Sequence, residues 1–176
     1  MSARSAAVAH DVSLAWIAGG VLVAAVAAVL LFRVAPSREV AGQVGQAIFN
    51  GLGRLMLVLS LVAAGSRLAI QRAAAPAQAA FSRATSPGSG PGSRRAFPLD
   101  IVLCGVMVAA SATLALWLTP AMAAIWETAP HDPGGTGLMG ADKTRFMRMH
   151  GAGNLLYLTL FGASTLLIAR RALVTR

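Results

Sequence analysis

Residues 12–32 read VSLAWIAGGVLVAAVAAVLLF, 21 residues without a charged side chain. A helix rises about 1.5 Å per residue and the hydrocarbon core of a bilayer is about 30 Å thick, so about 20 apolar residues cross it. Residues 101–126 and 151–169 are apolar stretches of similar length, and residues 48–70 form a fourth one that contains only two arginines. The sequence therefore predicts an all-α, polytopic membrane protein, a bundle of four transmembrane helices.

The composition agrees with this class. Hydrophobic residues make up 56% of the 176 residues and the mean hydropathy is +0.67, above the roughly 45–50% apolar content of soluble domains. Four spans use about half of the chain, so we expect one transmembrane domain over residues 1–176. The net charge of +9 comes from residues between and beyond the apolar stretches, which favours contacts with the lipid bilayer and argues against a nucleic-acid partner. The single cysteine, Cys104, excludes an intrachain disulfide.

Helix boundaries follow from the apolar pattern and its breakers. Residues 73–97 are rich in Ala, Ser, Pro and Gly, so we expect a flexible loop there. Pro120 lacks a backbone donor and should loosen or kink the third helix. Amphipathic lead-ins precede the second and fourth apolar stretches. The four helices are expected at about residues 11–33, 40–71, 99–126 and 142–171.

The distribution of Lys and Arg between the two sides of the membrane predicts the orientation. Nine Lys/Arg residues fall on the side of the predicted termini and six on the opposite side. Because cytoplasmic loops carry the excess of basic residues, both termini are expected in the cytoplasm. Fourteen arginines against one lysine, with abundant Ala and Gly, are typical of a GC-rich bacterial genome. We therefore expect a multi-pass protein of the bacterial inner membrane.

Three predicted helices carry a polar face, because residues at helical spacing share a face. The polar face of the third helix contains Asp100, Cys104, Met107 and Ser111. The stripe of the second helix contains Gln43, Gln46, Asn50 and Arg54. The stripe of the fourth helix contains Lys143, His150, Asn154, Tyr157 and Ser164. Polar groups at membrane depth are expected to turn away from lipid. Two interpretations stay open: the stripes hydrogen-bond one helix to another, or they line a polar cavity that opens outward.

The candidate ligand-binding residues are Arg54, Asn50, His150, Asn154 and Tyr157. Arg54 lies about one turn inside the expected outer boundary, where it either snorkels to the interface or binds an anionic ligand through its planar guanidinium. His150 is a candidate proton-responsive group or metal ligand, and a histidine that only hydrogen-bonds a neighbouring helix is the alternative.

Cofactor and catalytic sites are not predicted. A haem held by two histidines of one chain is excluded, because His10 and His150 fall on opposite sides of the membrane and His131 lies in a Pro/Gly-rich stretch. Met147, Met149 and His150 resemble copper(I) ligands, but Met149 points about 100° away from His150, so they do not converge. No metal-hydrolase, P-loop or nucleophile-elbow motif occurs in the chain. We expect no catalytic residue, no metal site and no cofactor.

Three short motifs resemble a family of small bacterial four-helix membrane proteins that carries a domain of unknown function and is similar to the eukaryotic transmembrane protein 205. They are AGQVG at 41–45 with Ile48 and Phe49, LTPAM at 118–122, and Phe146, His150 and Asn154 at intervals of four. The first resembles the start of the second helix, the second the Thr-Pro step that closes the third, and the last the opening of the fourth. The resemblance implies four helices and no established chemistry.

The leading hypothesis is a non-enzymatic integral membrane protein with an outward-facing polar pocket between the second and fourth helices. The first alternative is a small transporter or resistance protein that acts as an oligomer, because four helices enclose little volume. The second alternative is a metal- or haem-linked membrane redox protein. A homo-oligomer or another membrane protein as partner stays open.

Overall fold

The computed structural model describes residues 2–85, 99–130 and 138–174. Its regular elements, in chain order, are α1 (Ala3–Val34), α2 (Arg38–Thr85), α3 (Leu99–Ala112), the π-helical segment η1 (Thr113–Leu118), α4 (Thr119–Thr128) and α5 (Gly140–Val174). The helices long and apolar enough to cross a membrane are Ala3–Val34, Val40–Pro76, Leu99–Thr128 and Gly140–Leu173. These four spans confirm the predicted all-α, four-helix membrane protein.

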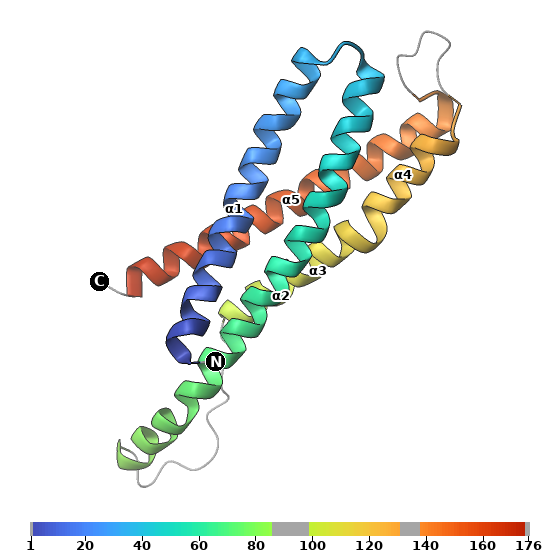
Figure 1. The fold of residues 1–176 in the computed structure, drawn as a ribbon. Helices are drawn as coiled ribbons and strands as arrows, with labels where there is room; N and C mark the ends of the chain where they lie inside the picture. Colours follow the sequence, from blue (N-terminus) through green and yellow to red (C-terminus); the bar gives the residue numbers. More distant parts are fainter. Residues whose placement is uncertain (1, 86–98, 131–137, 175–176) are drawn as a thin grey trace.

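The helices form an antiparallel bundle (Figure 1). Around the bundle, α1 packs against α2, α2 against α3, α3 against α5, and α5 against α1. Consequently α2 and α5 are diagonally opposite. We call the end that holds residues 35–37 and the start of α5 the turn end, and the end that holds Ala3 and the last turns of α5 the terminal end.

The first helix is longer than predicted because it has a capping residue. Ser5 donates its backbone N–H to the Ser2 hydroxyl oxygen at 3.1 Å, so α1 begins at Ala3 rather than near residue 11. At the start of α2, Val40 donates its backbone N–H to the Ser37 hydroxyl oxygen at 3.2 Å. The predicted lead-in ahead of the second apolar stretch is therefore helical and continuous with the span.

The predicted loop at 73–97 is wrong for its first half. α2 continues to Thr85 and extends beyond the rest of the bundle in Figure 1, and residues 86–97 lie outside the described residues. Six alanines stand among residues 73–80, and alanine is the strongest helix former. Pro76 lies inside α2 without ending it, which shows that this alanine-rich stretch outweighs a single proline.

The third span changes its hydrogen-bonding pattern next to Pro120. The amide of Thr119 donates to the carbonyl oxygen of Leu114, five residues earlier, within the π-helical turn η1. Proline has no N–H, and in an α-helix its ring collides with the carbonyl four residues before it. The wider π turn relieves that collision. The predicted loosening at Pro120 thus takes the form of η1.

The core draws on all four spans, and its largest fully buried side chains include Leu14, Ile17, Met56, Met107, Leu114 and Leu160. Each span also buries a serine, namely Ser13, Ser60, Ser111 and Ser164. Three of them donate to a carbonyl of their own helix at 2.8 Å, which satisfies the hydroxyl inside an apolar core. Small side chains at these positions let the helices approach closely.

Candidate functional site

A cavity of about 270 Å³ lies at the turn end, between α2, α5 and the continuous rod of η1 and α4. Most of its lining is apolar and includes Phe49, Leu114, Leu118, Met122, Trp126 and Phe146. Its polar lining residues are Gln46, Thr119, Lys143, His150, Asn154 and Tyr157. The cavity is therefore an apolar space with polar groups, which is the usual character of a small-molecule site. We call it the turn-end cavity.

One face of α5 supplies most of the polar lining. Lys143, His150, Asn154 and Tyr157 all line the turn-end cavity, as expected for residues spaced by seven, four and three along a helix. Lys143 and Asn154 are exposed, whereas His150 and Tyr157 are partly buried. The polar side of the cavity therefore reaches the surface of the bundle, and the apolar side lies against α2 and the η1–α4 rod.

Aromatic rings form a chain along the cavity. The ring centroids of Trp126 and Phe146 are 5.8 Å apart and tilted by 51°. Phe146 and His150, one turn apart on α5, stack with centroids 6.3 Å apart and planes within 9°. Such contacts orient aromatic side chains beyond what burial alone does, so His150 is held beside the apolar part of the cavity.

Tyr157 links α5 to α2 across the bundle. Its hydroxyl donates to the backbone oxygen of Phe49 at 3.4 Å, and the two rings lie 5.8 Å apart. In an α-helix one lone pair of a carbonyl oxygen accepts the hydrogen bond of the helix, so the second lone pair of the Phe49 oxygen can accept from Tyr157. This contact joins two helices that are diagonally opposite.

Two glycines of α2 permit the close approach of the η1–α4 rod. A Cβ on Gly42 would stand 3.0 Å from the Trp126 ring, closer than ordinary van der Waals contact. A Cβ on Gly53 would stand 3.6 Å from the Cα of Ala115 in η1, so here α2 lies against the backbone of the π-helical turn. Gly42 and Trp126 both line the cavity, so the first contact limits how closely α2 and α4 approach there.

The structure brings together three of the five candidate residues, since His150, Asn154 and Tyr157 line one cavity. Arg54 is exposed, and neither Arg54 nor Asn50 belongs to the lining of that cavity. Gln46 does line it. At 100° per residue, Asn50 is turned about 40° and Arg54 about 80° from Gln46, which moves Arg54 from the inner face to the edge of the helix. The Asn50 side-chain oxygen is buried and has no partner among the described residues.

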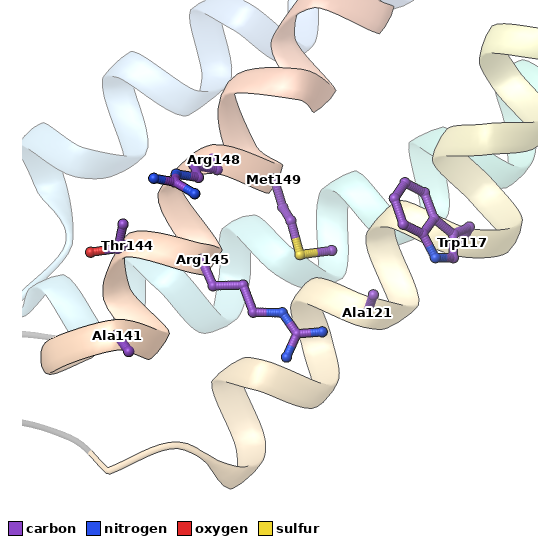
Figure 2. A pocket seen from close by; sticks show the side chains of 7 residues that line it. All are labelled: Trp117, Ala121, Ala141, Thr144, Arg145, Arg148 and Met149. Carbon is purple, nitrogen blue, oxygen red and sulfur yellow. The ribbon is translucent and has the colours of Figure 1, made fainter.

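A larger and more open depression of about 610 Å³ lies on the outside of the bundle between α4 and α5 (Figure 2). Its lining includes Trp117, Ala121, Arg145, Arg148 and Met149. Arg145 and Arg148 are exposed there, and arginines of this kind keep their stems on apolar surface while the charge reaches the interface. We regard this depression as lipid-facing surface.

A group of charged side chains at the terminal end was not predicted from the sequence. Asp100 of α3 pairs with Arg67 of α2 and Arg170 of α5, and Asp11 of α1 pairs with Arg171 of α5. The sequence does place these acids and arginines on the same predicted side of the membrane. Their pairing depends on which helices are neighbours, and a single sequence does not give that order.

Within the described residues 2–85, 99–130 and 138–174, no group of three or more His, Cys, Asp or Glu side chains is arranged to hold a metal ion. The partly buried His150 stacks against Phe146, and Met147 lines the same cavity.

Residues 12–131 match the family model described as Domain of unknown function (DUF4149). No curated protein matches the chain, and no solved structure does. The matched residues contain most of α1 and all of α2, α3, η1 and α4. They therefore hold the apolar side of the turn-end cavity, while α5 with its polar face lies beyond them. Because the match covers more than half of its length, the chain belongs to the DUF4149 family.

Proposed function

We propose that this multi-pass membrane protein binds a membrane amphiphile in the turn-end cavity and has no enzymatic activity of its own. The observation that carries the proposal is the arrangement of the lining. Trp126, Phe49 and Leu118 offer apolar surface, and Lys143, His150 and Asn154 follow one face of α5. A ligand with an apolar body and a hydrogen-bonding or anionic head matches both parts.

The size of the cavity limits the ligand. About 270 Å³ lies just below the range of about 300–1,000 Å³ that is usual for small-molecule sites. A single hydrocarbon chain or a small ring system fits this space better than a whole two-chain lipid. Lys143 is the only lysine of the chain and carries the positive charge that an anionic head would meet.

We place the protein in the inner membrane of a bacterium with both termini in the cytoplasm, which the excess of basic residues on the terminal side supports. The turn-end cavity then opens toward the outer side. We also propose that the bacterial four-helix family, which the motifs at 41–45 and 118–122 resemble, shares an ancestor with transmembrane protein 205.

Native mass spectrometry of the purified full chain tests the proposal. We expect a bound amphiphile, and Gly45→Leu should remove it, because Gly45 lines the cavity and a leucine there adds a side chain at a position that has none. Gly51→Leu is the matched control on the same helix, since nothing lies within 4 Å of its Cβ position. Equal ligand in both variants would contradict the proposal.

The same preparation separates the alternatives. A stoichiometric Soret band or one tightly bound copper per chain would support the redox alternative and overturn the proposal. The protein also transports the amphiphile if vesicles that contain it take the amphiphile up. Gly45→Leu should then abolish this uptake, and Gly51→Leu should retain it.

A further inference from the structure

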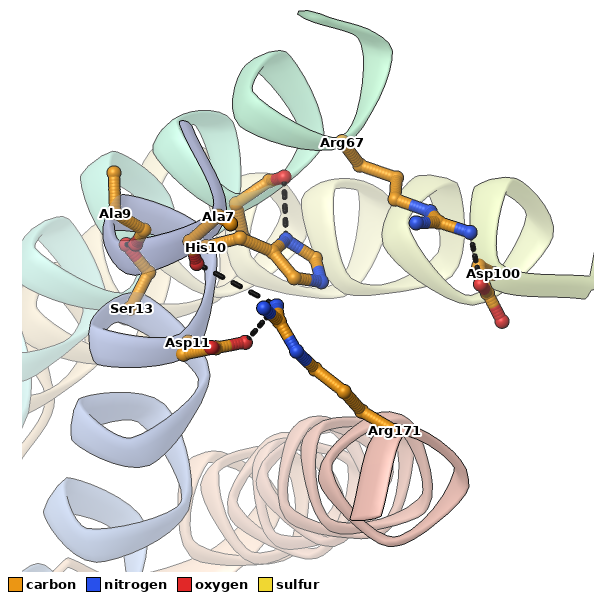
Figure 3. Close-up of polar contacts among 9 residues, drawn as sticks. Ala7, Ala9, His10, Asp11, Ser13, Arg67, Asp100 and Arg171 are labelled. Carbon is orange, nitrogen blue, oxygen red and sulfur yellow. Dashed lines mark hydrogen bonds and ion pairs between the residues drawn. The ribbon is translucent and has the colours of Figure 1, made fainter. Parts of the chain in front are cut away.

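A second cavity, of about 350 Å³, lies at the terminal end where all four spans meet. Its lining comes from α1 (Ala7, His10), α2 (Arg67, Ile70), α3 (Asp100) and α5 (Leu167, Arg170, Arg171). Figure 3 shows Arg171 of α5 reaching toward Asp11 beside His10, and Arg67 of α2 reaching toward Asp100 of α3. We call this space the terminal-end cavity.

Positive charge is in excess around this cavity. Asp100 is shared by Arg67 and Arg170, and Asp11 pairs with Arg171. Three guanidinium groups thus meet two carboxylates, which leaves one positive charge with His10 taken as neutral. An excess of positive charge among partly buried groups favours an anion at the same place.

At least one N–H donor of the cluster lacks an acceptor among the described residues. The Nε of Arg67 is buried and has no hydrogen-bond partner among the residues that the structure describes. Arg170 Nε lies 3.2 Å from Asp100 Oδ1, yet that oxygen accepts no hydrogen bond from described residues, so this ion pair lacks hydrogen-bond alignment. A guanidinium has five N–H donors, and a buried donor without an acceptor is unfavourable.

His10 also lines this cavity. His10 is buried, and its Nδ1 lies 2.9 Å from the backbone oxygen of Ala63. A carbonyl oxygen only accepts, so Nδ1 carries the hydrogen in this contact. In the neutral ring the other nitrogen, Nε2, has no hydrogen and is an acceptor at the cavity that His10 lines, so the donors to an anion are the guanidinium groups.

We infer that the terminal-end cavity binds a phosphate group. Guanidinium donors from α2 and α5 around a net positive space match the oxygens of a phosphate. The position also fits, because basic pockets between transmembrane helices bind the headgroups of anionic lipids. The phosphate has two sources, the headgroup of an anionic phospholipid or a free phosphate ion. A phosphate held there would tie α2 and α5 together at the membrane boundary.

Isothermal titration calorimetry on the full chain in detergent tests this inference with two probes, short-chain phosphatidylglycerol and inorganic phosphate. We expect one binding site per chain for at least one of them. Binding of phosphatidylglycerol alone identifies a lipid headgroup site, and equal binding of both identifies a phosphate-ion site. Neither probe binding, or zwitterionic phosphatidylcholine binding as tightly as phosphatidylglycerol, would overturn the inference.

Matched variants locate the site. Arg67→Gln should weaken binding by about tenfold or more, because it removes charge-assisted hydrogen bonds. Arg72→Gln removes the same charge from the same helix at an exposed position outside the lining and should leave affinity unchanged. Equal losses in the two variants would overturn the inference.

Two further variants separate a binding site from a purely structural ion-pair cluster. Asp100→Asn removes the carboxylate that competes for Arg67 and Arg170, so binding should become several-fold tighter. A structural cluster predicts no gain. If Arg67→Gln does not fold, Arg67→Lys keeps the charge but loses the planar fork, and it should still weaken binding; unchanged affinity would contradict the site.

Discussion

Tyr157 on α5 and Phe49 on α2 are joined by a hydrogen bond of 3.4 Å from the tyrosine hydroxyl to the phenylalanine backbone oxygen, although their helices are diagonally opposite in the bundle. Both residues also line the turn-end cavity. The contact therefore couples the polar face of α5 to the apolar face of α2 at one side of that cavity.

Replacing Tyr157 with phenylalanine should cost little stability. The change keeps the ring contact with Phe49 and removes one interhelical hydrogen bond, which is worth about 0.6 kcal/mol on average in membrane proteins. Thermal unfolding in detergent measures the effect, and Tyr157→Leu should lower stability further because the ring is lost as well. A larger loss for the phenylalanine variant than for leucine would contradict the contact.

Gly42→Ala should disturb the turn-end cavity. The new Cβ would stand 3.0 Å from the Trp126 ring, so the ring must move, and Trp126 lines the cavity. We expect a shifted Trp126 emission and weaker ligand binding. Gly51→Ala is the control, because its Cβ position is open. It should leave binding unchanged and raise helix stability by at most about 1 kcal/mol.

The polar head of the ligand should depend on α5 rather than on Arg54. Lys143 lines the turn-end cavity, whereas Arg54 is exposed and lies outside its lining. Lys143→Gln should therefore weaken binding of an anionic amphiphile several-fold, and Arg54→Lys should be silent in both affinity and stability. The opposite order of effects, measured in one titration series, would restore Arg54 as the anchor.

Reporter fusions test the orientation. Fusions after Arg176 and within residues 86–92 should both report a cytoplasmic location, because nine of the fifteen Lys/Arg residues fall on that side. An external signal at either position would reverse the bundle, and the turn-end cavity would then open toward the cytoplasm.

Hydropathy predicted the spans well because each apolar stretch must cross a membrane of fixed thickness. The start of α1 at Ala3 and the continuation of α2 to Thr85 were not predicted. Both lie outside the apolar stretches, where capping by Ser2 and the alanine content decide the boundary. Hydropathy does not register either effect.

The candidate site was predicted in part. Helical periodicity placed His150, Asn154 and Tyr157 on one face of α5, and all three line the turn-end cavity. Periodicity also grouped Arg54 with Gln46, although about 80° separates them, and that angle is enough to put Arg54 outside the lining. The pairing of Asp100 with arginines from α2 and α5 follows from the order of helices around the bundle, which no local pattern contains.

Quenching of Trp126 fluorescence tests the central claim, that the turn-end cavity binds an amphiphile, most directly. The chain has three tryptophans, so Trp16→Phe with Trp117→Phe leaves Trp126 as the only reporter in the cavity. Trp16→Phe with Trp126→Phe leaves Trp117, which is 62% exposed on the outside of the bundle, as the matched control. Titration with a bromododecanoic acid should quench Trp126 saturably and Trp117 only in proportion to the amount added. Equal, non-saturating quenching of both tryptophans would show that the acid merely partitions around the bundle and would contradict a binding site.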